Sequence, residues 1–324
     1  MTAQATISHL KALIYEKLSS LIDRDYVLYG LPYYTNIGDT LIWDGELEFL
    51  KSIPHKCIGT CGWDSYPDTT LNKDTIVLIT GGGYFGDTWR NGWEYVLHGI
   101  SNLKDNRIII LPNSIYYSNI ELLKEDSQYL AEFSDLIICA RDQYSYKLAC
   151  EHFSNKVLMV PDMAFCIDTD YLRKTMRPTS KDILYLKRND KEFVSDTEII
   201  TRDCATDIRD WPTMDSPSLF QRIIERIAGY IKALGSRHLI PEKLETAMLE
   251  PIYQDIYRKY MTKVGVEFVS QYKRIYTTRL HVMILAILLD KPIEFIDNSY
   301  GKLGNFYSTW LSDCDIVTEY RCQK

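Results

Sequence analysis

The run YTTRLHVMILAILLDKP, at residues 276–292, indicates more about the fold than any other stretch of the chain. Residues 273–278 are typical of a short strand. Residues 280–290 predict a helix that is apolar on nearly every side and is therefore deeply buried. A strand that leads directly into such a helix is typical of a sheet covered by helices.

Arg279 and His281 lie in the first turn of this predicted helix. The free N–H groups and the dipole of a helix N-terminus attract anions. A guanidinium group and an imidazole at the same place add positive charge and a proton donor, which makes this turn a candidate anion site. The structural alternative is that Arg279 pairs with a carboxylate of the core and that His281 packs beneath it.

Strand-like and helix-like patterns alternate outward from this run along the whole chain. In the first half, strands are predicted at residues 26–29, 75–80, 107–111, 136–140 and 157–160, and helices at 4–22, 40–51, 89–103, 119–132 and 142–152. In the second half, strands are predicted at 183–187, 266–269, 273–278 and 293–296, and helices at 217–234, 242–263 and 280–289. This alternation predicts an α/β fold with mostly parallel sheets.

Length and charge limit the classes of protein that fit. A chain of 324 residues suits two domains, which we place at residues 1–170 and 171–324, joined through the charged stretch 168–182. The net charge is −7 and no lysine- or arginine-rich tract is present, so nucleic acid is not an expected partner. We expect no signal peptide, and the longest apolar run, residues 282–289, is too short to cross a bilayer.

The eight cysteines form no CxxC pair, and the spacing of Cys57 and Cys61 is weak as a zinc signal. We therefore expect reduced thiols and a cytoplasmic protein. The 24 tyrosines have two explanations, which are ordinary packing and the lining of a sugar site.

Polar residues and glycines follow the predicted strands, where ligands of open α/β sheets bind. After the first strand comes NIGD, with Asn36, Gly38 and Asp39, although Asn36 or Asp39 could simply cap the next helix. After the second comes GGGYFGD, with Gly82, Gly83 and Asp87. This run contains G-x-G-x-x-G, which is a weak dinucleotide signal here because it does not open the first strand–helix unit. Three successive glycines still indicate close approach of the backbone to a ligand or to a neighbouring helix.

The later strands end in the same way. The residues concerned are Asn113 and Ser114 in LPNSIYY, Arg141 in ARDQYS, Asp162 in VPDMAF and Arg188 in LKRND. Because the carboxyl ends of parallel strands meet at one edge of a sheet, polar residues at six such junctions predict a shared site.

Taken in order, these motifs resemble those of the polysaccharide pyruvyl transferase family. The matching pieces are NIGD (36–39), GGGYFGD (81–87), LPNSIYY (111–117), ARDQYS (140–145), VPDMAF (160–165), Arg188, TTRLH (277–281) and IDNSYGK (296–302), which span roughly residues 26–310. One departure is LPNSIYY, where relatives often have Gln followed by His or Phe.

The resemblance implies an architecture similar to GT-B glycosyltransferases, with a cleft between two Rossmann-like domains. It also implies a helix after Gly301 that packs back on the N-terminal domain. The implied reaction moves the enolpyruvyl unit of phosphoenolpyruvate to a sugar, leaves a pyruvate ketal and releases phosphate, in the biosynthesis of an exopolysaccharide or a capsule.

The same resemblance suggests roles for the candidate residues. His281 is the expected general acid, and Arg279, Arg188 and Arg141 are expected to hold the carboxylate and phosphate. Asp39, Asp87 or Asp162 could accept the hydroxyl proton, and the sequence does not rank them; we assign Asp39 and Asp87 to the chemistry and Asp162 to substrate binding. The remaining substrate-binding candidates are Asn36, Gly38, Gly82, Gly83, Asn113 and Ser114. No metal and no cofactor is expected.

The acceptor is expected to be a sugar, a nucleotide sugar, or a lipid-linked or polymeric glycan. Peripheral contact with a membrane-bound acceptor is left open, as are the sugar, its hydroxyl groups and the oligomeric state. Two other functions compete with pyruvyl transfer. One is a GT-B-type glycosyltransferase that uses a nucleotide sugar, and the other is a non-catalytic scaffold for polysaccharide assembly.

Overall fold

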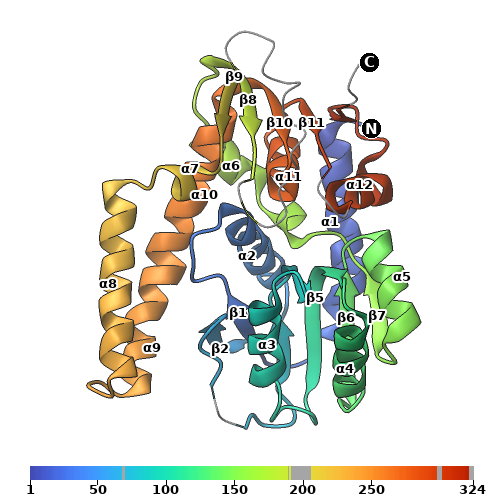
Figure 1. The fold of residues 1–324 in the computed structure, drawn as a ribbon, viewed down its shortest axis with the longest axis vertical. Coiled ribbons are helices and arrows are strands. Elements are labelled where there is room, and N and C mark those ends of the chain that lie inside the picture. Colours follow the sequence, from blue (N-terminus) through green and yellow to red (C-terminus); the bar gives the residue numbers. More distant parts are fainter. Residues whose placement is uncertain (68–69, 189, 191–205, 298–300, 321–324) are drawn as a thin grey trace.

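The computed structural model describes residues 1–67, 70–188, 190, 206–297 and 301–320, and shows two sheets, one above the other in the view of Figure 1. The first sheet contains β1 (Tyr26–Leu31), β2 (Cys57–Gly62), β3 (Ile76–Ile79), β4 (Gly82–Gly86), β5 (Arg107–Tyr116), β6 (Asp135–Ala140) and β7 (Lys156–Met159). Its order is β2-β1-β3-β5-β6-β7, and β4 pairs with β5.

The second sheet contains β8 (Lys181–Leu186), β9 (Thr206–Arg209), β10 (Tyr272–Thr277), β11 (Ile293–Phe295) and β12 (Val317–Glu319), in the order β12-β11-β10-β8-β9. Every strand pair within the described residues is parallel. The predicted α/β fold, with two Rossmann-like halves in a GT-B-like arrangement, is therefore confirmed.

Helices surround both sheets. The longer ones are α1 (Ala3–Leu18), α2 (Ile37–Leu50), α3 (Arg90–Gly99), α4 (Ile120–Leu130), α5 (Gln143–His152), α8 (Leu219–Ser236), α9 (Glu242–Pro251), α10 (Arg258–Ser270) and α11 (Leu280–Leu288). Shorter segments are η1 (Ser19–Leu21), η2 (Met163–Cys166), α6 (Thr169–Thr175), α7 (Pro212–Asp215), the π-helix η4 (Ile252–Tyr257), α12 (Lys302–Phe306) and the π-helix η5 (Tyr307–Leu311). None of the described helices combines the length and apolar character that a membrane span requires.

The alternation of side chains along β1 separates two apolar cores. Leu28 belongs to a core that also contains Leu184 and most of α11, whereas Val27 and Tyr29 belong to a core with Trp93 of α3. Successive residues of a strand point to opposite faces, so each face of the first sheet buries its own set of apolar side chains. The first of these cores continues into the second half of the chain.

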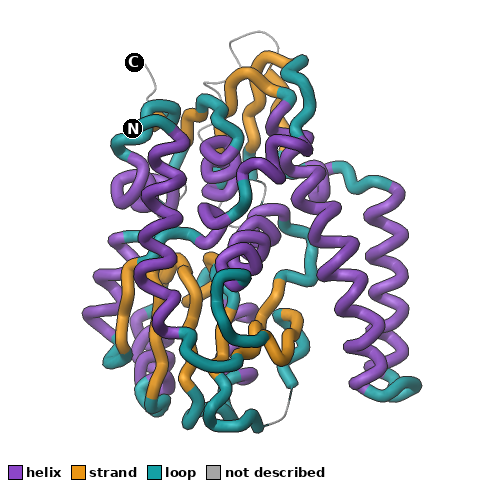
Figure 2. The backbone as a smooth tube through the Cα atoms, turned by 180° about the vertical axis from the view of Figure 1, so that it is seen from behind, coloured by secondary structure: helices purple, strands orange, loops and turns teal. Residues whose placement is uncertain are grey.

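Helices also join the two halves directly. Figure 2 shows α1 extending from the level of one sheet to that of the other, and α1 packs against α11. Helix α2 packs against α10, where buried Asp44 forms an ion pair with Arg258 and accepts a hydrogen bond from Thr262. The halves are therefore held by helix packing as well as by the connecting chain.

The prediction of a strand at residues 266–269 is wrong, because this segment is the end of α10. The buried residues of α10 include Met261, Gly265, Val266 and Val269, whose spacing follows the helical period and not the alternation of a strand. Two β-branched valines gave a local strand signal that the longer helical pattern overrides.

The segment after Gly301 forms α12 and η5 and then β12. Trp310 Nε1 donates a hydrogen bond to the carbonyl oxygen of Arg141 at 2.7 Å, and Thr309 Oγ1 accepts one from the backbone N–H of Gln143 at 3.0 Å. Residues 309 and 310 thus contact the segment between β6 and α5 of the first half.

Candidate functional site

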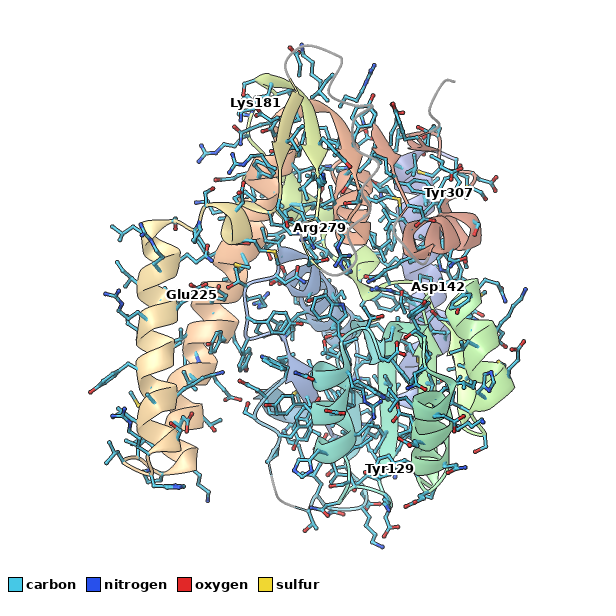
Figure 3. The ribbon with its side chains drawn as sticks, viewed as in Figure 1. Tyr129, Asp142, Lys181, Glu225, Arg279 and Tyr307 are labelled. Atoms are coloured by element: carbon cyan, nitrogen blue, oxygen red, sulfur yellow. The ribbon has the colours of Figure 1, made fainter. Side chains whose placement is uncertain are left out.

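A cavity of about 540 Å³ lies where the two halves meet. Its volume is within the usual range for a small-molecule site. The sequence-predicted residues that line it are Asn36, Gly38, Asp39, Gly83, Asp87, Arg141, Arg188, Arg279 and His281. Gly82, Asn113, Ser114 and Asp162 are absent from the lining, and the last three are buried behind it. Figure 3 shows Arg279 in the region between the two sheets.

Arg141, Asp162 and His281 form a compact cluster at the cavity wall. Asp162 Oδ2 accepts a hydrogen bond from Arg141 Nη1 at 2.8 Å and lies 3.3 Å from His281 Nε2. Ser114 Oγ accepts a further hydrogen bond from Arg141 Nε at 2.9 Å. Burial of Asp162 acts to raise its pKa, but the charges of His281 and Arg141 outweigh it and hold the pKa well below the usual range. Asp162 is therefore an anion that orients the imidazole and the guanidinium group.

One nitrogen of this cluster is left over. Arg141 is fully buried, and its Nη2 has no hydrogen-bond partner in the described part of the chain. Buried polar groups almost always have partners, so an orphaned guanidinium nitrogen beside a cavity indicates a place for an anionic ligand.

Lys302 is a cavity residue that the sequence analysis did not single out. It is nearly buried, and an added Cβ at Gly83 would lie 2.5 Å from Lys302 Nζ and 3.2 Å from Arg141 Nη2. Two cations from different halves thus converge at Gly83, and an added Cβ there would displace Lys302 Nζ. The sequence signal was IDNSYGK, which follows β11 as the other motifs follow their strands.

Arg279 and Arg188 line the cavity but are paired with carboxylates. Arg279 donates from Nε and Nη2 to the two oxygens of buried Asp210, at 2.6 Å each. Arg188 makes a similar two-point contact with Asp190, at 2.7 and 2.9 Å. The structural alternative for Arg279, pairing with a core carboxylate, therefore describes this structure. Its role in ligand binding stays a prediction.

His281 approaches the N-terminus of α2 closely. A Cβ at Gly38 would lie 2.7 Å from His281 Nδ1, so position 38 must be glycine for the imidazole to sit where it does. Leu280 and His281 open α11, whose N-cap Arg279 provides no side-chain cap. The first turns of α2 and α11 therefore face the same cavity, and both favour negative charge there.

The NIGD turn holds Asp39 at the cavity. Asn36 caps α2, since its Oδ1 accepts a hydrogen bond from the Gly38 N–H at 2.9 Å, while its Nδ2 donates to Asp39 Oδ2 at 2.6 Å. The Tyr34 hydroxyl donates to the same oxygen at 2.9 Å. Asp39 is thus held in one orientation by two donors.

Asp87 has structural contacts. Its Oδ2 accepts hydrogen bonds from Ser118 N, Ser118 Oγ and Asn119 N, at 2.7, 2.9 and 2.8 Å, and these fix the loop before α4. The glycine run is held in a comparable way by buried Glu46, which accepts from Gly81 N at 2.7 Å and Thr80 Oγ1 at 2.8 Å. Burial raises the pKa of Glu46 to about 8.

Aromatic side chains form much of the remaining wall. They are Tyr34, Trp63, Tyr66, Tyr84, Trp89 and Trp211. Sequence reasoning did not find this set, because Trp63 and Tyr66 follow β2, a strand whose glycine-containing sequence gave no clear signal. Tyr34, Tyr66 and Tyr84 line the cavity, whereas Tyr29 and Tyr272 pack in the cores. That the cavity tyrosines contact a sugar stays a prediction.

Comparison with known proteins gives consistent matches along nearly the whole chain. The sequence model of the family described as polysaccharide pyruvyl transferase matches residues 36–300. The putative pyruvyl transferase EpsO of Bacillus subtilis (strain 168) is 27% identical over 94% of this chain and 92% of its own length. Pyruvyl transferase 1 of Schizosaccharomyces pombe is 24% identical over 89% of this chain and 70% of its own. A crystal structure of a functionally uncharacterised Klebsiella pneumoniae protein shares the fold, with a TM-score of 0.55 at 20% identity over 94% and 92% of the two chains.

Proposed function

The chain belongs to the polysaccharide pyruvyl transferase family, and we propose that it transfers the enolpyruvyl unit of phosphoenolpyruvate to a sugar of a cell-surface polysaccharide or its precursor. The methylene carbon of the donor gains a proton, and a sugar hydroxyl attacks the neighbouring carbon. The bond from that carbon to the phosphate oxygen breaks, phosphate leaves, and a second hydroxyl closes the ketal. The six free cysteines among the described residues support a reducing compartment such as the cytoplasm.

The observation that supports this proposal most strongly is the orphaned Nη2 of buried Arg141, next to Lys302 and His281 at one wall of the cavity. A donor with a carboxylate and a phosphate requires clustered cations, and both cations here approach the same point. In this proposal Arg141 and Lys302 hold one anionic group of the donor. Arg279 and Arg188 contact the second anionic group of the donor, and each replaces part of its hydrogen bonding to Asp210 or Asp190 with contacts to that group.

His281 is the proposed acid that protonates the methylene carbon. Ionised Asp162, whose Oδ2 lies 3.3 Å from His281 Nε2, fixes the orientation of the imidazole. Asp39, held by Asn36 and Tyr34 at the cavity, is the proposed acceptor of the hydroxyl proton. The aromatic wall offers flat apolar faces on which a sugar ring can rest.

The test combines binding with turnover. Phosphoenolpyruvate should raise the melting temperature, and less so at high salt, because it binds a charged site of the native state. With a panel of sugar acceptors, phosphate release and a mass gain of one pyruvate ketal should appear together. His281→Asn should lower turnover by on the order of a hundredfold while donor affinity changes much less.

One result would overturn the proposed reaction, and another would change the assignment of its acid. Stabilisation by a nucleotide sugar but not by phosphoenolpyruvate would favour glycosyl transfer. Near-normal turnover of His281→Asn would remove His281 from the chemistry and leave the acid to be found among Asp39, Asp87 and Asp162.

A further inference from the structure

Helix α8 carries an apolar stripe that faces away from the protein. Phe220, Ile223, Ile227 and Tyr230 are spaced three, four and three residues apart, which places them on one side of the helix, and all four are exposed, Tyr230 by 66%. Ten of the seventeen exposed large hydrophobic residues of the described chain fall between Met214 and Ile256, so this exposure is a local property of the arm that contains α8. Concentrated apolar exposure of this kind is typical of an interaction surface.

The opposite side of α8 already has partners. Glu225 accepts hydrogen bonds from Thr35 and Tyr257, and Lys232 forms an ion pair with Asp64 at 2.9 Å. Figures 1 and 2 both show α8 at the outer edge of the molecule, with the α9–α10 helices between it and the sheets. The apolar stripe therefore lies on a face that the described residues of the chain leave uncovered.

A row of arginines borders the stripe. Arg222, Arg226 and Arg237 are exposed, and at 100° per residue they fall within about 60° of one another, along one edge of the apolar side chains. None of the three forms an ion pair with a described residue, although the chain as a whole has a net charge of −7. An apolar face edged by free guanidinium groups is the pattern of a helix that lies in the interface of an anionic membrane.

We propose that the stripe and arginine row of α8 dock the protein onto the surface of an anionic lipid bilayer. Lipid phosphates pair with the arginines, and the apolar side chains enter the region below the headgroups. A second copy of the chain fits this face less well. Its own α8 would bring another row of arginines, while the only carboxylate of α8, that of Glu225, is engaged on the other side.

Helix α8 follows the cavity wall closely in the sequence. Met214 of α7 lines the cavity and is itself 40% exposed, and α8 begins five residues later at Leu219. Exposed apolar residues thus continue along the sequence from Met214 through Leu219 to the stripe. The docking proposal does not depend on the reaction proposed above, since lipid binding is measured without substrates.

The experiment is cosedimentation of the full chain with vesicles of phosphatidylcholine, with and without phosphatidylglycerol. We expect binding only to the anionic vesicles, with a marked decrease on adding salt. Arg222→Glu/Arg226→Glu should lower binding about tenfold or more. The matched control is Lys147→Glu/Lys174→Glu, which changes the net charge equally at exposed residues elsewhere and should bind like the wild type.

The apolar contribution is tested in the same assay. Ile223→Ser/Ile227→Ser should lose most vesicle binding, whereas Ile58→Ser/Ile120→Ser, at equally exposed isoleucines of other elements, should retain it. Melting curves verify that each variant folds, and Arg222→Gln/Arg226→Gln provides a milder change if the glutamates disturb the helix.

Absence of wild-type binding to anionic vesicles, or equal binding by arm and control variants, would overturn the proposal. Sedimentation velocity tests whether a second copy of the chain occupies this face. If the wild type does not bind vesicles but forms a dimer, and Ile223→Ser/Ile227→Ser dissociates that dimer, the face would be assigned to a second copy of the chain instead.

Discussion

Arg279 both lines the cavity and closes a two-point pair with buried Asp210. Arg279→Lys keeps the charge but cannot contact both oxygens at once, so Asp210 loses a partner in a buried place. We expect a lower melting temperature without ligand, together with weaker phosphoenolpyruvate binding measured by calorimetry. An unchanged melting temperature with lost binding would instead make Arg279 chiefly a ligand contact, and the Asp210 pair dispensable.

Glu46 should make stability depend on pH. Its pKa rises from 4.5 to about 8 on folding because it is buried, so the folded state binds the proton more tightly than the unfolded state. The contribution of Glu46 to stability is then highest below pH 4.5 and falls as pH rises towards 8, by up to about 1.4 kcal/mol per pH unit.

Glu46→Gln keeps an acceptor for the Gly81 N–H but cannot ionise. Urea unfolding at pH 5 and pH 8 should therefore show a smaller difference for the variant than for the wild type. Other titrating groups are common to both proteins and cancel in the comparison. Equal differences in the two proteins would show that Glu46 does not govern this range.

Single residues differ in how far the sequence reveals them. His281, Asp39 and Arg141 follow strand ends, and that local rule was enough to predict that they share a cavity. Glu46 was not predicted, because a glutamate within a helix usually faces solvent. Lys302 was not selected, because its neighbour Gly83 is 219 positions away in the sequence and belongs to the other half.

At the scale of elements, the contact between α2 and α10 is the clearest test of what holds the halves together. Arg258→Met leaves Asp44 buried without its cation while preserving packing volume, and should cost about 3–5 kcal/mol of unfolding free energy. Lys73→Met breaks the exposed pair with Asp105 and should cost no more than about 1 kcal/mol. Denaturant unfolding of both variants gives the comparison, and similar small losses would show that Arg258 contributes little to the stability of buried Asp44.

Elements also differ in predictability. Long strands such as β5 and the apolar helix α11 were predicted, because their apolar pattern continues over many residues. β4 and β12 were not predicted, since β4 is glycine-rich and β12 has only three residues. These strands are stabilised by pairing with their neighbours in the sheet and not by a strong local strand preference. The end of α10 was misassigned for the opposite reason, as a local strand signal within a longer helix.

At the scale of the whole molecule, chain length and the alternation of elements predicted two α/β halves, and the family resemblance implied a cleft between them. The division at residues 170 and 171 stays a prediction, and one apolar core includes residues of both halves, such as Leu28 and Leu184. The sequence did not predict that α8 and α9 project outward from the rest of the protein. An amphipathic pattern predicts that a helix has an apolar face, but the face that the rest of the chain leaves uncovered is decided only by packing.

The close contacts around Gly83 suggest a variant with a practical use. A methyl group there would intrude between Lys302 Nζ and Arg141 Nη2, and no positive backbone torsion forbids it. Gly83→Ala would then act as a plug that keeps out the donor but leaves the aromatic wall open. The Gly83→Ala variant could then be used for affinity capture, because it would retain its glycan acceptor from a cell extract without converting it.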